Sequence, residues 1–200
     1  NYCLCSKDPL RLQNNQQGKC RRCKDKKLSG LYSALPYKEK FLTKKLVYQF
    51  KYQPYLKMLS KTLSDILIEH LVLTKNNSEE IWENSILIPV PIDKIKLRRR
   101  GYNQSEELAK QLSNTLKIPV ISNALVKLKS TPSQTTLSKE QREENVKGVF
   151  SVDNKLEIKG KKVFLIDDIY TTGSTMEECA NVLRTSEAKQ AWGIVVAREG

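Results

Sequence analysis

The sequence is short of histidine, glycine and long apolar runs, and each shortage narrows the class of protein. Its single histidine, His70, falls in a segment of helical pattern, where we assign it no catalytic role. Eight Gly and seven Pro in 200 residues exclude a collagen-like, low-complexity or wholly disordered chain. No apolar stretch approaches the ~20 residues of a membrane-spanning helix, and the first residues lack the apolar core of a signal peptide. We therefore expect a cytoplasmic protein.

The basic charge of the chain is concentrated near its N-terminus. The whole chain holds 35 Lys and Arg against 22 Asp and Glu, a formal net charge of +13. Residues 1–60 hold 14 basic and 3 acidic residues, a net of +11, whereas residues 61–200 hold 21 and 19, a net of +2. Such a basic block is typical of a protein with a polyanionic partner, most simply a nucleic acid. A solvated lysine-rich face with no partner is the alternative interpretation.

Four of the five cysteines lie within the first 23 residues. Cys20 and Cys23 have the C-x₂-C spacing of a zinc knuckle, whereas Cys3 and Cys5 form a tighter C-x-C pair. The polar segment around them is too short to bury a core, and disulfides are disfavoured in a reducing cytoplasm. We expect residues 1–27 to form a small zinc-ribbon-like module with a structural Zn²⁺ on these four cysteines; a site that has lost its metal is the alternative. The fifth cysteine falls in a later helical segment, where we expect a small buried apolar residue.

The remaining residues, 28–200, alternate between helical and strand-like patterns. Apolar spacing near 3.6 residues predicts helices over 41–73 (interrupted at Pro54), 103–116 and 174–184. Short continuous apolar runs predict strands buried on both faces at 86–90, 163–166 and 191–197. Polar composition suggests a basic connector over 24–40 and a loop over 127–141. The alternation indicates an α/β fold, a parallel sheet flanked by helices.

The most informative stretch, residues 162–175, reads Lys-Val-Phe-Leu-Ile-Asp-Asp-Ile-Tyr-Thr-Thr-Gly-Ser-Thr. Its apolar residues lead into adjacent carboxylates, Asp167 and Asp168, at the carboxyl end of a strand, where open α/β sheets bind ligands. The turn that follows offers hydroxyls, backbone N–H groups, a flexible Gly173 and a predicted helix N-terminus, which together make a phosphate cradle. Carboxylates repel phosphate but accept hydrogen bonds from sugar hydroxyls. A ribose 5′-phosphate satisfies both halves of the stretch.

Two other interpretations of this stretch are weaker. The strand and its carboxylates resemble a Walker B motif, but the sequence holds no G-x₄-G-K-[ST] Walker A partner. The hydroxyl-rich turn also suits a simple helix cap, with Thr172 or Ser174 at the N-cap. A cap uses one hydroxyl, however, and explains neither the other hydroxyls nor the paired carboxylates.

The same run resembles the phosphoribosyl-pyrophosphate signature of type I phosphoribosyltransferases. Other segments narrow the resemblance to the ComF family of competence-associated proteins. Besides the N-terminal cysteines, the matching motifs are Phe50-Lys51-Tyr52, Ile88-Pro89-Val90-Pro91, Arg100-Gly101-Tyr102-Asn103-Gln104, and the positions Gln134, Leu137, Ser138, Arg142, Asn145 and Phe150. They follow the family's order and cover essentially the whole chain. Lys127 stands where the family commonly has Arg, which turns a bidentate contact into a point charge.

The resemblance implies a fold, a ligand and a metal. The fold is that of type I phosphoribosyltransferases, and the ligand is phosphoribosyl pyrophosphate bound with Mg²⁺. By resemblance, Asp167 and Asp168 are the catalytic residues and hold the ribose hydroxyls, directly or through the metal. The residues expected to hold the anionic groups are Thr171, Thr172, Gly173, Ser174 and Thr175 for the 5′-phosphate, with Arg100 beside the pyrophosphate and Arg142 in a loop that closes over the ligand.

In the enzymes that the chain resembles, a nucleophile displaces pyrophosphate from carbon 1 of the ribose, and positioning with Mg²⁺ carries most of the catalysis. No acceptor-specific residues stand out in the sequence, so two hypotheses remain open. In the first, the protein is a phosphoribosyltransferase with an unidentified acceptor, associated with DNA uptake. In the second, it is a non-catalytic accessory protein that binds single-stranded DNA and a competence helicase or recombination mediator.

Aromatic side chains accompany the basic charge in the N-terminal third, and they are able to stack on bases. For two of them, Tyr48 and Phe50, we expect a place in the core instead. The full set is Tyr32, Tyr37, Tyr48, Phe50, Tyr52 and Tyr55.

Overall fold

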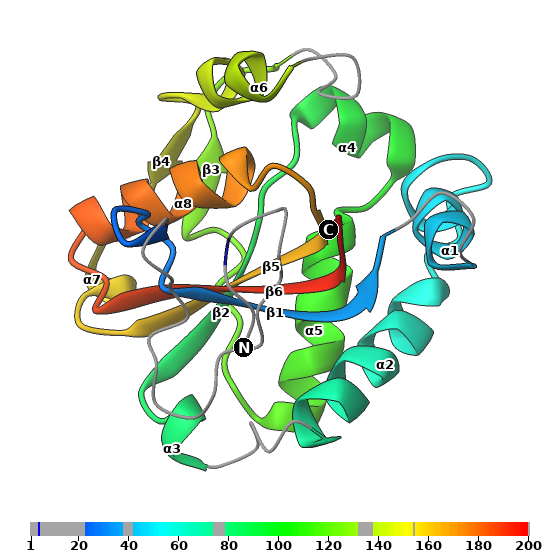
Figure 1. Cartoon of the computed structure of the whole chain (residues 1–200), viewed down its shortest axis with the longest axis horizontal. Coiled ribbons are helices and arrows are strands. Elements are labelled where there is room, and N and C mark those ends of the chain that lie inside the picture. Colours follow the sequence, from blue (N-terminus) through cyan, green and yellow to red (C-terminus); the bar gives the residue numbers. More distant parts are fainter. Residues whose placement is uncertain are drawn as a thin grey trace.

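A four-stranded parallel sheet with strand order β1-β6-β5-β2 forms the centre of the molecule (Figure 1). The computed structural model describes positions 4, 23–37, 42–73, 79–131, 138–153 and 155–199. The sheet consists of β1 (Gly30–Pro36), β2 (Ser85–Pro89), β5 (Lys162–Tyr170) and β6 (Gln190–Arg198). A separate antiparallel pair is made by β3 (Leu125–Lys127) and β4 (Phe150–Val152). The predicted α/β fold class is confirmed.

Helices cover both faces of the parallel sheet (Figure 1). One face packs against α1, α2 and α5, and the other against α8 and the β3–β4 pair. The helices are α1 (Leu42–Lys51), α2 (Leu59–Leu73), α3 (Glu79–Trp82), α4 (Lys94–Arg100), α5 (Gln104–Leu116), α6 (Lys139–Val146), α7 (Lys155–Ile158) and α8 (Ser174–Thr185). Among the helices that the structure describes, none is long and apolar enough to cross a membrane.

The strands owe their apolar runs to burial on both faces. Along β5, Val163 and Leu165 join the core cluster on the α8 side, whereas Phe164 and Ile166 join the cluster on the α2 and α5 side. Successive side chains of a strand point to opposite faces, so a strand covered on both sides must be apolar at every position. The continuous apolar run in the sequence therefore predicted this strand correctly.

The site lies where the chain leaves β2 and β5 in opposite directions. The connection after β2 leads to α5 on one face, and the connection after β5 leads to α8 on the other. The pairing of β2 with β5 ends at Pro89 opposite Ile166, while β5 continues to Tyr170 beside β6 alone. The carboxyl end of β5 thus projects beyond its neighbour at a topological switch point, the usual ligand site of open α/β sheets.

Several sequence-based predictions need correction. The segment read as a basic connector contains β1, an edge strand whose mixed Gly, Ser and Pro composition hides its pairing with β6. The last residues of the predicted loop, 139–141, belong to α6 (Lys139–Val146), which begins with a capping box between Ser138 and Gln141. Tyr48 is 54% exposed and not part of the core, whereas Phe50 is fully buried as expected. Phe50 lies on the inward face of α1 and Tyr48 on the outward face.

Two of the five cysteines, Cys23 and Cys179, lie among the described residues. Cys179 in α8 is fully buried, as expected of a small apolar residue. Cys23 is 3% exposed and packs in the same core cluster as Leu4 and Leu28. Cys3, Cys5 and Cys20 lie outside the described residues, so the zinc site and the domain boundary after residue 27 stay predictions.

Candidate functional site

A cavity of about 740 Å³ opens at the carboxyl end of the parallel sheet. Its lining contains every predicted ligand-binding residue outside the N-terminal cysteines, although these come from segments far apart in the sequence. We call Asp167 and Asp168 the acid pair and Thr171–Thr175 the phosphate turn. The acid pair and the phosphate turn follow one another along β5 and into α8, whereas Arg100 ends α4 and Arg142 lies in α6. The tertiary structure thus brings all four groups to one cavity.

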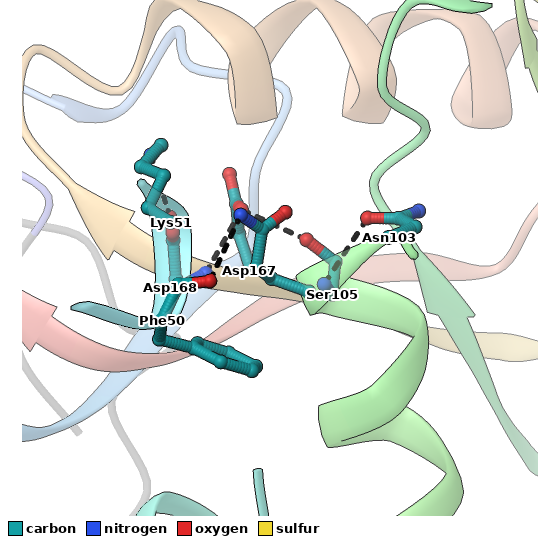
Figure 2. A network of polar contacts seen from close by, with 7 residues as sticks. Phe50, Lys51, Asn103, Ser105, Asp167 and Asp168 are labelled. Carbon is teal, nitrogen blue, oxygen red and sulfur yellow. Dashed lines mark hydrogen bonds and ion pairs between the residues drawn. The ribbon is translucent and has the colours of Figure 1, made fainter. Parts of the chain in front are cut away.

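Hydrogen bonds from the start of α5 hold the first carboxylate of the acid pair. Oδ1 of Asp167 accepts from Ser105 Oγ at 2.9 Å and from the backbone N–H of Asp168 at 2.8 Å. Asn103, the N-cap of α5, accepts from the backbone N–H of Ser105 at 3.1 Å and so fixes this serine. Figure 2 shows this chain of polar contacts from Lys51 through the acid pair to Ser105 and Asn103.

The electrostatic surroundings make Asp167 an unusually weak acid. Burial and the neighbouring charge of Asp168 raise the pKa of Asp167 to about 7, against an ordinary value of 3.8. The charge of Lys51 and the hydrogen bonds from Asp168 and Ser105 act in the opposite direction but do not outweigh them. Two adjacent carboxylates cannot both ionise freely in a partly dry cavity, so one of them holds its proton to neutral pH.

Lys51 is the counter-ion of the second carboxylate. Its Nζ atom lies 3.0 Å from Oδ1 of Asp168, and the side chains are 33% and 3% exposed, respectively. Burial alone would lower the pKa of Lys51, but Asp168 and Asp167 raise it to about 12. The other oxygen of the pair, Oδ2 of Asp168, is buried and has no hydrogen-bond partner among the described residues. An acceptor atom in that position is available to a ligand hydroxyl or a metal ion.

Two sequence motifs cooperate to place Lys51. The carbonyl oxygen of Phe50 accepts a hydrogen bond from Tyr102 Oη at 2.7 Å and a longer one from Gln104 Nε2 at 3.5 Å. Phe50 also packs its ring 5.7 Å from that of Tyr102. The Phe-Lys-Tyr motif at the end of α1 is therefore fastened to the Arg-Gly-Tyr-Asn-Gln motif before α5, which in turn orients Ser105 toward Asp167.

The helix that follows the phosphate turn begins without a side-chain cap at its N-cap residue, although Thr172 Oγ1 accepts a long hydrogen bond from the Ser174 N–H at 3.5 Å. Gly173 is the N-cap of α8, with φ +80° and no side-chain cap. The helix-cap interpretation is therefore wrong: neither Thr172 nor Ser174 is the N-cap, and their hydroxyls contact each other at 2.9 Å. A side chain on Gly173 would collide with the ring of Tyr170, so this position needs glycine on two grounds. The first turn of a helix has N–H groups without intrahelical partners, and these suit an anion.

The two predicted arginines carry buried nitrogen atoms without a hydrogen-bond partner among the described residues. The Nε atoms of Arg100 and Arg142 are buried and lack a hydrogen-bond partner within the part of the chain that the structure describes. Burial lowers the pKa of Arg100, and the charge of Asp168 partly offsets this. Buried unsatisfied donors are costly, so a bound anion is the simplest partner for them.

Residues beyond the acid pair, the phosphate turn and the two arginines also line the cavity, and of these Ser105 is one that the sequence analysis missed. The basic run that ends α4 divides: Arg99 and Arg100 line the cavity and Arg98 does not. Ser105 directly follows the Arg-Gly-Tyr-Asn-Gln motif, so its position was a signal that could have been used. Arg142 of the expected closing loop lies in α6 and lines the cavity, whereas residues 132–137, with Gln134 and Leu137, lie outside the described residues, so closure of the loop stays a prediction. The additional lining residues with polar or aromatic side chains include Tyr37, Tyr48, Tyr52, Gln53, Tyr55, Asp93, Lys96 and Lys127.

The acid pair fits the requirements of a magnesium ion. Mg²⁺ prefers oxygen ligands and is usually held by one or two carboxylates together with phosphate groups of the substrate. The buried, unpartnered Oδ2 of Asp168 is an oxygen of this kind. The described residues contain no group of three or more His, Cys, Asp or Glu side chains that would hold a metal by themselves. A metal here would therefore be held jointly by the protein and a phosphorylated ligand.

Residues 67–200 match the family model described as the phosphoribosyl transferase domain. Competence protein F of Haemophilus influenzae is 36% identical over 155 residues, which are 76% of this chain and 67% of that protein. DNA utilization protein YhgH of Escherichia coli is 30% identical over 149 residues, 74% of this chain and 64% of that protein. Competence protein ComFC of Bacillus subtilis is 31% identical over 99 residues, 49% of this chain and 38% of that protein. The chain thus spans about two thirds of the length of the first two relatives.

Solved structures show more distant similarity. One is the glutamine phosphoribosylpyrophosphate amidotransferase of B. subtilis, complexed with ADP and GMP. The match covers 70% of this chain and 26% of the amidotransferase chain, at 20% identity and a TM-score of 0.44. Another is the purine phosphoribosyltransferase of Pyrococcus horikoshii. That match covers 68% of this chain and 82% of the transferase chain, at 18% identity and a TM-score of 0.38. The sequence matches are therefore the stronger comparison.

Proposed function

Because the chain belongs to the phosphoribosyl transferase domain family, and within it to the ComF proteins, we propose that it binds phosphoribosyl pyrophosphate with Mg²⁺ and transfers the phosphoribosyl group to an acceptor. The observation that carries this proposal is the shared cavity of the acid pair, the phosphate turn and two arginines with buried, unpartnered nitrogens. A ligand with a phosphate at one end, a sugar in the middle and a second anion at the other matches this order of groups.

Each part of the ligand has a suitable partner in the cavity. The phosphate turn takes the 5′-phosphate, with N–H groups from the first turn of α8 and hydroxyls from Thr172 and Ser174. The acid pair takes the two ribose hydroxyls, using the unpartnered Oδ2 of Asp168. Arg100 and Arg142 take the pyrophosphate as charge-assisted donors. The acid pair, together with the phosphorylated ligand, would hold Mg²⁺, which would supply positive charge toward the leaving group.

The residues of the chain supply positioning and electrostatics. Positive charge develops on the sugar ring as pyrophosphate departs, and the carboxylate of Asp168 lies where it stabilises such a charge. Lys51 pairs with Asp168 at 3.0 Å, and Ser105 holds Asp167 in place by the hydrogen bond at 2.9 Å. No nucleophilic side chain is required, because the acceptor itself attacks carbon 1.

Calorimetry with phosphoribosyl pyrophosphate and Mg²⁺ tests the binding step. The unmutated protein should bind, and the double change Asp167→Asn with Asp168→Asn should weaken binding at least about tenfold, through lost charge-assisted contacts. Asp65→Asn is the matched control, because Asp65 lies on the exposed face of α2 in a surface ion pair with Lys61. No binding by the unmutated protein would overturn the proposal.

The names of the relatives suggest a role in competence, and we place this chain in the uptake or use of DNA. The proposal predicts that a strain producing the protein with both acid-pair changes takes up or incorporates DNA poorly, and that a deletion strain shows the same defect. The Asp65→Asn strain is the control. If the acid-pair strain is transformed normally, the cavity is not needed for competence.

A second basic feature favours the alternative function, binding of a nucleic acid. A cleft of about 770 Å³ lies at the opposite end of the sheet, beside Ser29 before β1 and Gln190 at the start of β6. We call it the basic cleft. Arg184 in its wall donates hydrogen bonds to the carbonyl oxygens of Ala188 and Lys189, and the other basic residues that line the cleft are lysines. They are Lys24, Lys26, Lys27 and Lys189.

Binding to single-stranded DNA should therefore be steeply salt-dependent, since each phosphate contact releases about one counterion. Changing Lys24, Lys26 and Lys27 to Gln should weaken this binding and flatten its dependence on salt. Changing three exposed lysines elsewhere, Lys117, Lys147 and Lys155, to Gln removes the same charge and serves as the control. Equal losses in both variants would indicate overall charge and not the basic cleft.

A further inference from the structure

We propose that the described positions ahead of β1, Leu4 and residues 23–29, brace the phosphate turn, so that they and a phosphorylated ligand at the turn stabilise each other. We call these positions the N-terminal brace. Two attachments connect the brace to the turn, one through Tyr170 and one through Glu177. The inference rests on the proposed function, because it requires a phosphorylated ligand at the turn. It adds two positioning residues that the proposed function does not use.

The two attachments stand on either side of the phosphate turn. Tyr170 is the last residue of β5 and immediately precedes the turn, whereas Glu177 lies in the first turn of α8, two residues after it. Their partners are at positions 4, 27 and 28, near the other end of the chain. The backbone that is to hold the anion is therefore flanked by contacts to a remote part of the sequence.

The side chain of Tyr170 lies between the brace and Gly173. Its hydroxyl donates a long hydrogen bond to the carbonyl oxygen of Leu4 at 3.4 Å, and both residues are buried in the same core cluster. A β-carbon added at Gly173 would lie 2.2 Å from the same hydroxyl oxygen, so this end of the ring packs directly against the backbone of the turn. The guanidinium of Arg198 lies over the ring, 5.6 Å from its centroid. Leu4 and Arg198 thus position a ring that the turn packs against.

Glu177 makes the second attachment. Its two carboxylate oxygens accept hydrogen bonds from the backbone N–H groups of Lys27 at 2.5 Å and Leu28 at 3.2 Å. Figure 1 shows the stretch before β1 (blue) beside α8 (orange). Leu28 is buried in the core cluster that contains Leu4 and Met176. Hydrogen bonds to a charged acceptor are stronger than neutral ones, so this contact ties the first turn of α8 to the brace.

The attachments imply a coupling that works in both directions. An anion at the phosphate turn requires the N–H groups of the first turn of α8 in one arrangement. The brace holds that arrangement before the ligand arrives, so less conformational entropy is lost on binding. By linkage, the ligand strengthens the docking of the brace by the same factor by which the brace strengthens ligand binding. Coupling between sites is typically worth about 5- to 150-fold in affinity.

Leu4→Asp tests the brace, because burying a carboxylate in the core cluster is costly and favours release of this residue. Calorimetry with phosphoribosyl pyrophosphate and Mg²⁺ should give an affinity about fivefold or more below that of the unmutated protein. Leu156→Asp is the matched control, since Leu156 is 86% exposed and does not line the cavity; its affinity should be unchanged. Equal affinities of the Leu4 variant and the unmutated protein would overturn the inference.

Hydrogen exchange measures the same coupling from the other side, in the unmutated protein. The amides of Lys27 and Leu28 donate to Glu177, so their protection reports on the docked brace. Saturating phosphoribosyl pyrophosphate with Mg²⁺ should slow their exchange by about the factor that separates the two affinities. The control is the amide of Gly160, in an exposed turn away from the cavity, which donates to the carbonyl of Glu187 at 2.9 Å and should slow less. Equal slowing at all three amides would mean general stabilisation of the domain and would contradict the coupling.

A second variant keeps the test decisive if Leu4→Asp fails to fold. Tyr170→Phe with Glu177→Gln weakens both attachments while keeping the buried ring and the length of the side chains. In this double variant the ligand should slow exchange at residues 27 and 28 much less than in the unmutated protein. Glu178→Gln is the control, because Glu178 accepts from the amide of Gly148 instead, and its ligand-induced slowing should persist. Full slowing in the double variant would overturn the inference.

The outcomes separate this inference from the proposed function. If phosphoribosyl pyrophosphate binds the unmutated protein but affinity and exchange ignore the changes in the brace, the coupling is overturned and the binding function stands. If the unmutated protein binds no phosphoribosyl pyrophosphate, both are overturned.

Discussion

The Nζ atom of Lys51 lies 3.0 Å from Oδ1 of Asp168, so that the last residue of α1 is tied to the carboxyl end of β5. The two residues are far apart in the sequence and belong to different motifs: Lys51 to Phe-Lys-Tyr, and Asp168 to the run of residues 162–175. The ion pair ties the segment that carries Tyr48 and Tyr52 to the acid pair across the same cavity. It also neutralises a carboxylate that would otherwise be buried without a partner.

The first prediction concerns this ion pair. Changing Lys51 to Gln should lower the free energy of unfolding by about 1 to 3 kcal/mol, because it leaves the charge of Asp168 buried and uncompensated. Affinity for phosphoribosyl pyrophosphate should fall as well, because the carboxylate of Asp168 would face the anionic ligand without its positively charged partner. Chemical denaturation and calorimetry measure the two effects.

Lys61→Gln is the matched control for the ion-pair change. Lys61 pairs with Asp65 at 3.1 Å one turn along α2, with both side chains well exposed, so its loss should cost no more than about 0.5 kcal/mol. A Lys51 variant as stable as the Lys61 variant would show that Asp168 is solvated well enough without its partner.

The second prediction concerns pH. Asp167 has its pKa raised to about 7 from 3.8, so between about pH 4 and pH 7 the folded protein holds a proton that the unfolded chain has lost. The contribution of Asp167 to stability is therefore present below pH 4 and is lost as the pH rises through 7. Asp167→Asn should remove this decline. Unfolding curves of both proteins from pH 4 to 8 should diverge, and parallel curves would show that Asp167 titrates normally.

The third prediction concerns Gly173 and its fit against Tyr170. Gly173→Ala should abolish measurable binding of phosphoribosyl pyrophosphate, because the turn must shift to free the new methyl group from the tyrosine ring. The left-handed backbone adds a stability cost of about 1 to 2 kcal/mol. Gly160→Ala is the control: its φ is +69°, but open space surrounds it and it lies away from the cavity. It should lose similar stability and keep ligand binding; equal binding by both variants would refute the cradle.

The fourth prediction concerns the attachment of α8 to the N-terminal segment. Glu177 accepts hydrogen bonds from the backbone N–H groups of Lys27 at 2.5 Å and Leu28 at 3.2 Å. Glu177→Gln should speed hydrogen exchange at these two amides, since a neutral amide is a weaker acceptor. Its neighbour provides the control, because Glu178 accepts instead from Gly148 at 2.8 Å. Glu178→Gln should loosen residue 148 and leave 27 and 28 protected; the reverse pattern would contradict this attachment.

The fifth prediction concerns zinc. Metal analysis of the purified protein should find one Zn²⁺ per chain, and Cys20→Ser should lose it, because a tetrahedral site needs all four thiolates. Cys179→Ser is the control, since Cys179 is buried in α8. Clearly less than one zinc in the unmutated protein would reject the Cys₄ site.

Local sequence patterns were reliable where one physical cause dominates. The apolar run of β5 predicted its strand because burial on both faces leaves no polar position. The failures came where partners decide the structure. β1 has an unremarkable composition and becomes a strand through hydrogen bonds to β6, while α6 depends on a capping box within a polar segment that has little apolar pattern.

By itself the sequence determined the α/β fold class, the acid pair, the phosphate turn and the family, because these depend on residues that are adjacent in the chain. Only the tertiary structure showed that Lys51 pairs with Asp168, that Ser105 holds Asp167, and that the tyrosines face the same cavity. It also showed that some of the basic residues of the N-terminal third, Lys24, Lys26 and Lys27, line a separate cleft at the other end of the sheet. Ion pairs and cavities join residues that the chain keeps apart, and their geometry follows from the packing of helices on the sheet.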